Sequence, residues 1–199
     1  MTTPSKLNIG SGSIFVVGEG WLNIDHDNHY HRAVQAGAKF RILDVTQAGS
    51  LQTIGPPGSM EFITSSEFFE HLDIVTGEAF LRVCHIMLRR GGRVRIGTPD
   101  LEILLAFLQA GKMDELAPYQ PDIFSEYKSQ AAKFAMYVFG ALSGRPEYTG
   151  HRHIYDEESL RECLTRCGFV DVKRVEWDGA LGDAPQGKGV SIYMEGSKS

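Results

Sequence analysis

A short glycine turn between two strand-like segments near the N-terminus constrains the fold of this chain most strongly. Residues 7–12 read LNIGSG, and a second apolar run, WLNID, ends at Asp25. Glycine lacks a Cβ atom, so the backbone can turn sharply after the first strand and a ligand can approach it closely. An acidic residue at the end of the second strand is placed to accept hydrogen bonds from ribose hydroxyls. The segment therefore predicts a ribose-binding edge of an α/β sheet.

The spacing within this segment discriminates between nucleoside cofactors. A dinucleotide fingerprint needs a third glycine, where this chain has Phe15, and a helix N-terminus for the pyrophosphate. Only eight residues, 13–20, separate Gly12 from Trp21, which is too few for a full crossover helix with its loops. S-adenosylmethionine (SAM) carries no phosphate and does not need that anion site. The spacing disfavours NAD and is compatible with SAM.

Strand-like and helix-like segments alternate along the 199 residues, which predicts one α/β domain with a Rossmann-like, doubly wound and mainly parallel sheet. A helix is expected at 75–89 and another at 157–167, with Asp156 as the N-cap of the second. Residues 101–150 carry two helical patterns, at 101–108 and 124–142, which we interpret as a helical insertion or lid after the fifth strand. The last two of the expected strands form a closing antiparallel pair, and all seven lie at 6–9, 21–24, 40–43, 61–64, 93–97, 170–177 and 190–194.

Charge and composition limit the expected partners. The formal net charge is −5, and an acidic surface repels phosphate backbones, so nucleic acid is not expected. No apolar run approaches the ~20 residues that a membrane span requires, and the N-terminus lacks the apolar core of a signal peptide. We therefore expect a cytoplasmic protein that acts on a small molecule, while the oligomeric state cannot be predicted. The densest basic run, which we interpret as cations at a helix C-terminus, contains Arg82, Arg89, Arg90, Arg93 and Arg95.

Five blocks occur along residues 6–175, in the order LNIGSG, GWLNID, SSEFFEHL, LRRGGRVRIGTPDLE and HRHIYDEESLRECLTRCGF. They resemble a family of small predicted class I SAM-dependent methyltransferases, in which the comparable blocks read approximately LNLGCG, GWINID, SSHVLEHL, LKPGGRLRISVPDL and a late helix ending in GF. Two departures from that pattern are present. Ser11 stands where the family usually has cysteine, and GPPGSMEF replaces an FD-type dipeptide before the fourth strand.

The resemblance implies a set of cofactor-binding residues, most of them at strand ends. The glycines of the first turn would line the methionine part of SAM, and the acid after the second strand would hold the ribose. The acid after the third strand would lie near the adenine amino group, and the serines after the fourth would face cofactor or substrate. These residues are Gly10, Ser11, Gly12, Asp25, Asp44, Ser65 and Ser66.

Three histidines are candidates for a catalytic base. Methyl transfer is an in-line displacement at carbon, so positioning alone can supply roughly 7–11 kcal/mol. A base helps when the acceptor is a hydroxyl or an amine. The resemblance places His71 at the mouth of the active site, and His151 and His153 lie between the inserted residues and the last helix. We hypothesise that His71, or the pair His151 and His153, removes the acceptor's proton.

A second group of histidines, His26, His29 and His31 with Asp27, contains good ligands for a transition metal. It follows the expected ribose anchor directly, where the chain should run past the adenosine. We therefore predict no metal site.

Two other classes of function stay open at this point. The chain could be a non-catalytic SAM-binding or degenerate partner module, because no N-P-P-Y block for amino-group methylation is present and TPDLE follows the fifth strand. It could also be an NAD- or nucleotide-sugar-dependent enzyme, which the missing third glycine disfavours. The sequence does not identify the methyl acceptor.

Overall fold

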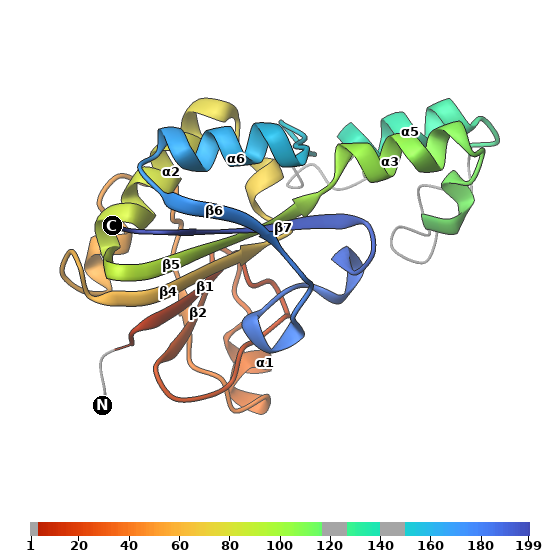
Figure 1. Ribbon diagram of the computed structural model, residues 1–199. Coiled ribbons are helices and arrows are strands. Elements are labelled where there is room, and N and C mark those ends of the chain that lie inside the picture. Colours follow the sequence, from red (N-terminus) through yellow and green to blue (C-terminus); the bar gives the residue numbers. More distant parts are fainter. Residues whose placement is uncertain (1–3, 117–126, 140–149) are drawn as a thin grey trace.

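A seven-stranded sheet forms the centre of the computed structural model, which describes residues 4–116, 127–139 and 150–199 (Figure 1). The strand order is β3-β2-β1-β4-β5-β7-β6. The first five strands are parallel to one another, and β7 runs antiparallel to both β5 and β6. This topology confirms the predicted α/β class with a closing antiparallel pair. The strands are β1 (Lys6–Ile9), β2 (Trp21–Asp25), β3 (Phe40–Ile42), β4 (Met60–Ser66), β5 (Leu88–Pro99), β6 (Val170–Val175) and β7 (Ser191–Ser197).

Helices cover both faces of the sheet. The helices α2 (Ile74–Met87) and α6 (Glu157–Arg166) lie together on one face, and the short helix α1 (Tyr30–Gln35) lies on the other (Figure 1). The largest apolar cluster joins α2 and α6 to the central strands. Single 3-10 turns connect the elements at η1 (Leu51–Thr53), η2 (Phe69–His71), η3 (Met113–Leu116), η4 (Gly179–Leu181) and η5 (Pro185–Gly187).

The start of α6 confirms the predicted N-cap. The backbone amide of Ser159 donates to the Asp156 carboxylate (2.8 Å), and the amide of Asp156 donates to the Ser159 hydroxyl (3.1 Å). This reciprocal capping box satisfies two amides at the helix start, where no intrahelical acceptors exist.

The inserted helices α3 (Leu101–Gln109) and α5 (Gln130–Phe139) extend to one side of the sheet (Figure 1). They share a second, smaller apolar cluster, which includes Leu104, Met113 and Tyr137 and also Val190 directly before β7. The helix expected at 101–108 is present, and α5 falls within the one expected at 124–142. Residues 124 and 142 themselves lie outside the described part of the chain, and the role of a lid stays a prediction. Across the described residues, no helix is long and apolar enough to cross a bilayer.

The interpretation of the basic run as a helix C-terminus is wrong. The helix α2 ends at Met87 and β5 begins at Leu88, so only Arg82 of this run belongs to the helix. Arg95 lies in the middle of β5 and is only 2% exposed.

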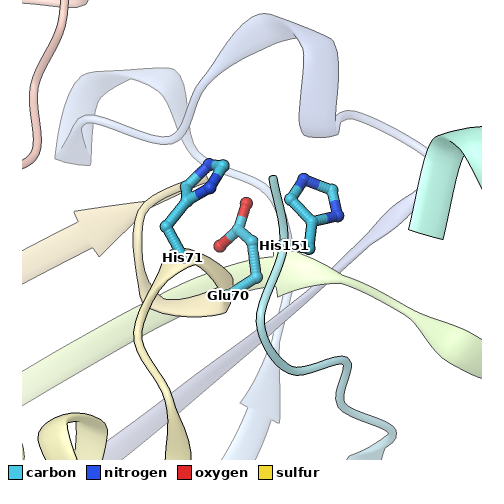
Figure 2. Close-up of side chains that lie close together, drawn as sticks. All are labelled: Glu70, His71 and His151. Atoms are coloured by element: carbon cyan, nitrogen blue, oxygen red, sulfur yellow. The ribbon is translucent and has the colours of Figure 1, made fainter. Parts of the chain in front are cut away.

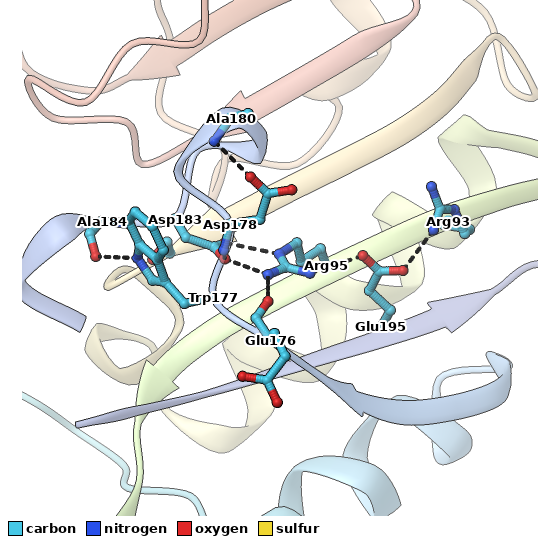
Figure 3. A network of polar contacts seen from close by, with 10 residues as sticks. Arg93, Arg95, Glu176, Trp177, Asp178, Ala180, Asp183, Ala184 and Glu195 are labelled. Carbon is cyan, nitrogen blue, oxygen red and sulfur yellow. Dashed lines mark hydrogen bonds and ion pairs between the residues drawn. The ribbon is translucent and has the colours of Figure 1, made fainter. Parts of the chain in front are cut away.

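The buried guanidinium of Arg95 is the centre of a polar network (Figure 3). It donates to both carboxylate oxygens of Asp183, to the Glu195 carboxylate (3.0 Å) and to the backbone carbonyl of Glu176 (2.5 Å). Glu195 also accepts from the exposed Arg93 (2.8 Å). The network, hereafter the Arg95 network, joins β5 to β7 and to the segment that connects β6 with β7. Each buried charge has an opposite partner, so removing one member would leave an uncompensated charge inside the protein, which is strongly destabilising.

Candidate active site

The sheet reverses its strand order between β1 and β4, since β2 and β3 extend from β1 to one side and β5 extends from β4 to the other. Ligands of open α/β sheets bind at the carboxyl ends of strands beside such a switch point. A cleft of about 620 Å³ lies there. Its wall includes Gly10, Asp25, Asp44, Glu67, His71 and Arg152.

The glycine turn after β1 forms one part of the wall. Gly10 and Gly12 have φ angles of +66° and +50°, in the left-handed region that side chains rarely adopt. A Cβ atom on Gly10 would lie 2.5 Å from the Cβ and Cγ atoms of Phe68, so this position has no room for a side chain. Residues 13–20, all of them described, form loops and turns without a helix. The turn therefore offers a backbone surface to a ligand but no helix N-terminus for a pyrophosphate.

The carboxylate of Asp25 connects this turn to the end of β2. One oxygen accepts the backbone amide of Gly12 (2.8 Å), and the other accepts the amide of Asp27 (3.0 Å) and lies 3.1 Å from Nδ1 of His26. Asp25 is 8% exposed and lines the cleft. A carboxylate has about four lone-pair sites, so it can accept hydroxyl donors from the cleft as well.

The remaining predicted cofactor residues differ in position. Asp44 lies exposed on the wall, where its carboxylate accepts from the hydroxyl and amide of Thr46 (2.6 and 2.9 Å), and these bonds, the hydroxyl's above all, lower its pKa. Ser65 is fully buried in β4, and the hydroxyl of Ser66 accepts the backbone amide of Ala184 (3.0 Å). Ser65, Ser66 and Ser11 are all buried, and none of the three is part of the cleft wall.

Glu67, which the sequence interpretation did not select, lies on the wall directly after β4. Its φ is +56°, although it is not a glycine. Strained backbone of this kind costs about 1–3 kcal/mol and is concentrated at functional sites. One carboxylate oxygen accepts the hydroxyl of Ser191 (2.7 Å). Burial raises the pKa of Glu67 to about 7, against the lowering effect of that hydrogen bond, and the negative charge of Asp183 adds to the rise.

Two of the three predicted histidines meet beside a buried acid (Figure 2). The rings of His71 and His151 lie 5.0 Å apart between centroids, and the carboxyl group of Glu70 lies between them. Glu70 is 1% exposed. Burial raises its pKa well above the ordinary value, and burial lowers the pKa of His151 to about 4, with a further lowering from His71. We refer to these three residues as the Glu70 cluster.

Backbone hydrogen bonds hold the second segment of this cluster in place. The consecutive amides of Arg152 and His153 both donate to the carbonyl of Glu70, at 2.8 and 3.2 Å. They anchor the chain around His151 against η2. The ring of His153 packs on Tyr155 instead, with centroids 4.4 Å apart, and lies outside the cleft wall. The structure thus brings His71 and His151 together and leaves His153 apart.

The other histidine group is more dispersed. His26 pairs with Asp25 and Asp27, and His31 lies beside Gln35 (3.2 Å). His29, Asp25 and Asp27 each have one candidate ligand atom within 4.8 Å of the other two.

Comparisons with known proteins identify the fold. No protein-family model matches the sequence, and no curated protein matches it. A SAM-dependent methyltransferase from Thermotoga maritima, described as a possible histamine N-methyltransferase, is similar with a TM-score of 0.56 and 13% identity, over 100% of this chain and 84% of the other. A SAM-dependent methyltransferase from Methanosarcina mazei gives 0.59 and 14%, over 100% and 94%. This chain has the class I methyltransferase fold.

A third structure with this methyltransferase fold contains ligands. It is the 1,6-didemethyltoxoflavin-N1-methyltransferase of Burkholderia thailandensis, with 1,6-didemethyltoxoflavin and S-adenosylhomocysteine bound. Its TM-score is 0.54 at 14% identity, over 98% of this chain and 72% of the other. Two further matches, SibL and PigF, are longer, and the chain spans 50% of each.

Proposed function

We propose that this chain transfers the methyl group of SAM to a small molecule. The observation that carries the proposal is the cleft at the switch point of a methyltransferase fold, where Asp25 and a glycine turn that no helix follows face one cavity. Bound there, SAM would supply a methyl group on a positively charged sulfur.

Three groups on the cleft wall have the chemistry to hold this cofactor. The backbone of Gly10 and Gly12 would lie along the methionine part, since neither residue has a side chain that would block it. Asp25 would accept the ribose hydroxyls through the lone pairs that Gly12 and Asp27 leave available. Asp44 would accept from the adenine amino group, because its exposed carboxylate borders the same cleft.

The proton of the acceptor would pass to a group beside the cofactor. His71 lies on the cleft wall, and so does Glu67, whose pKa of about 7 is near the value at which a general base works best at neutral pH. His151 would act through His71 rather than on the acceptor. A cleft of about 620 Å³ falls within the range of small-molecule sites, and the net charge of −5 disfavours a polyanionic acceptor.

Titration calorimetry with SAM tests the cofactor assignment. We expect wild type to bind SAM and Asp25→Ala to bind it at least about tenfold more weakly, a loss of about 1.4 kcal/mol. Asp27→Ala is the matched control, since Asp27 borders the same cleft with a 69% exposed side chain, and it should change affinity less than about threefold. Tighter binding of NADH than of SAM would contradict the proposal.

Turnover separates an enzyme from a SAM-binding module. Release of S-adenosylhomocysteine with a panel of small-molecule acceptors is the expected result, and His71→Ala should reduce turnover at saturating SAM. SAM binding without any release across the panel would favour the non-catalytic module instead.

A further inference from the structure

The Glu70 cluster assembles metal-ligating side chains from two distant parts of the chain. Glu70 and His71 come from η2, and His151 comes from the segment before α6. One candidate ligand atom from each residue lies within 4.8 Å of the other two. We propose that these three residues bind one divalent transition-metal ion at the edge of the cleft.

Two atoms of the cluster are buried polar groups that need a partner. Oε2 of Glu70 and Nδ1 of His151 have no hydrogen-bond partner among the described residues. A buried polar atom in this state costs about 1–3 kcal/mol. Figure 2 shows the carboxyl group of Glu70 directed between the two rings. A single cation at that point would satisfy both orphaned atoms at once.

The donor set selects the class of metal. Two imidazole nitrogens and one carboxylate oxygen suit zinc and its first-row neighbours, whereas magnesium and calcium prefer oxygen ligands throughout. Two ligands of one tetrahedral zinc ion lie about 3.4 Å apart, because each bond is about 2.1 Å long. The candidate ligand atoms lie within 4.8 Å of one another, so the widest pair needs to close by no more than about 1.4 Å, which is within the reach of side-chain rotation.

The surroundings of His151 match those of a metal ligand. Its ring hydrogen-bonds the backbone of Val138, which leaves Nδ1 as the nitrogen without a partner. Metal-bound histidines usually donate their other ring N–H to a carbonyl or carboxylate, which fixes the orientation of the ring. The amides of Arg152 and His153 hold the same segment to Glu70. Three protein ligands leave a coordination position for water or for an oxygen of a small molecule.

A second group with ligating atoms, Asp25, Asp27 and His29, is a weaker candidate. Both oxygens of Asp25 already accept backbone amides, and the Asp27 side chain is 69% exposed. An exposed carboxylate loses little free energy when no cation is bound, since water solvates it.

Titration of the chelator-treated full chain with Co²⁺ tests the proposal, because coordination by protein nitrogen produces visible absorption bands. We expect one ion per chain, and at least about tenfold weaker binding in Glu70→Gln and in His151→Gln. His153→Gln and His29→Gln are matched controls, which should bind as wild type does. Thermal melts verify that each variant folds. If Glu70→Gln does not fold, the test depends on His151→Gln, because His151 is only half-buried.

The proposal is overturned if wild type binds no Co²⁺, or if Glu70→Gln and His151→Gln both keep wild-type affinity. Loss of binding in His29→Gln would assign the ion to the Asp25 group and overturn it equally. The titration uses no SAM and no acceptor, so its result is independent of the proposed methyl transfer.

Discussion

The Arg95 network and the Glu70 cluster are both buried and polar, yet only the first is complete. Arg95 has a partner for each of its donating nitrogens, and the carboxylates of Asp183 and Glu195 are both paired with it. In the Glu70 cluster, Oε2 of Glu70 and Nδ1 of His151 have no hydrogen-bond partner within the part of the chain that the structure describes. The comparison separates two uses of buried polarity. The members of the Arg95 network satisfy one another, whereas the two unpaired atoms of the Glu70 cluster would be satisfied by the proposed metal ion.

Their positions agree with this division. The Arg95 network joins the antiparallel edge of the sheet to the segment between β6 and β7 (Figure 3). The Glu70 cluster borders the cleft through His71, on the side where β4 ends.

Removing the centre of the complete network should have the largest effect on stability. Arg95→Ala leaves the buried carboxylate of Asp183 without a cation and removes one of the two cations that pair with Glu195, so we expect the free energy of unfolding to fall by about 3–5 kcal/mol. Urea unfolding at pH 7 measures this. The control is Arg93→Ala, whose half-exposed ion pair should contribute no more than about 1 kcal/mol. Equal losses of unfolding free energy in the two variants would show that the buried Arg95 contributes no more to stability than the exposed Arg93.

Glu67 belongs to neither region but interacts electrostatically with Asp183 of the Arg95 network and with Glu70, and it provides a pH-dependent test. Its pKa in the folded chain, about 7, is above its ordinary value of 4.5, so folding takes up a proton and wild type loses stability as the pH rises from 5 to 8. Glu67→Gln should be more stable than wild type by about 2 kcal/mol at pH 8 and similar to it at pH 5, less than the full linkage because the side chain borders the cleft.

Urea unfolding at both pH values checks this expectation, with Glu162→Gln on the exposed face of α6 as the control. If Glu67→Gln is no more stable than wild type at pH 8, the folded chain tolerates the negative charge of the Glu67 carboxylate.

Glu70→Gln in metal-free protein should have the smallest effect. Burial raises the pKa of Glu70 well above its ordinary value, so wild type takes up a proton here on folding and loses stability as the pH rises. The neutral amide should leave the free energy of unfolding at pH 6 within about 1 kcal/mol of wild type, or raise it. Glu195→Gln is the control in the complete network, where losing a charged partner should cost about 1–3 kcal/mol. A similar loss in both variants would mean that Glu70 is a structural acid like Glu195.

Local sequence patterns predicted most of the fold. The seven strands, the glycine turn and the Asp156 cap depend on residues close together in the chain, and the structure contains all of them. Strand boundaries were less accurate. The strand β5 begins at Leu88 rather than at residue 93, because Leu88 already pairs with Met60 ahead of an irregularity in the ladder.

The site was harder to predict because its determinants are not local. The run LRRGGRVR suggested that Arg95 is a cation near a helix C-terminus, because its partners Asp183 and Glu195 are far away in the sequence. The meeting of His71 with His151 depends on backbone bonds from residues 152 and 153 to Glu70. Glu67 was missed because no sequence pattern encodes a positive φ at a glutamate. The only available signal was an acid immediately after the fourth strand.

The contact between Gly10 and Phe68 limits the substitutions that related sequences can carry at these two positions. The missing Cβ atom at one position is the space that the aromatic ring of the other occupies. A residue larger than glycine at position 10 would need both a smaller residue at position 68 and a backbone that tolerates its φ of +66°, so any change at position 10 should be accompanied by a change at position 68 among related sequences. Such covariation would link the turn after β1 to the loop after β4. A contact between two distant segments could then be identified from sequences alone.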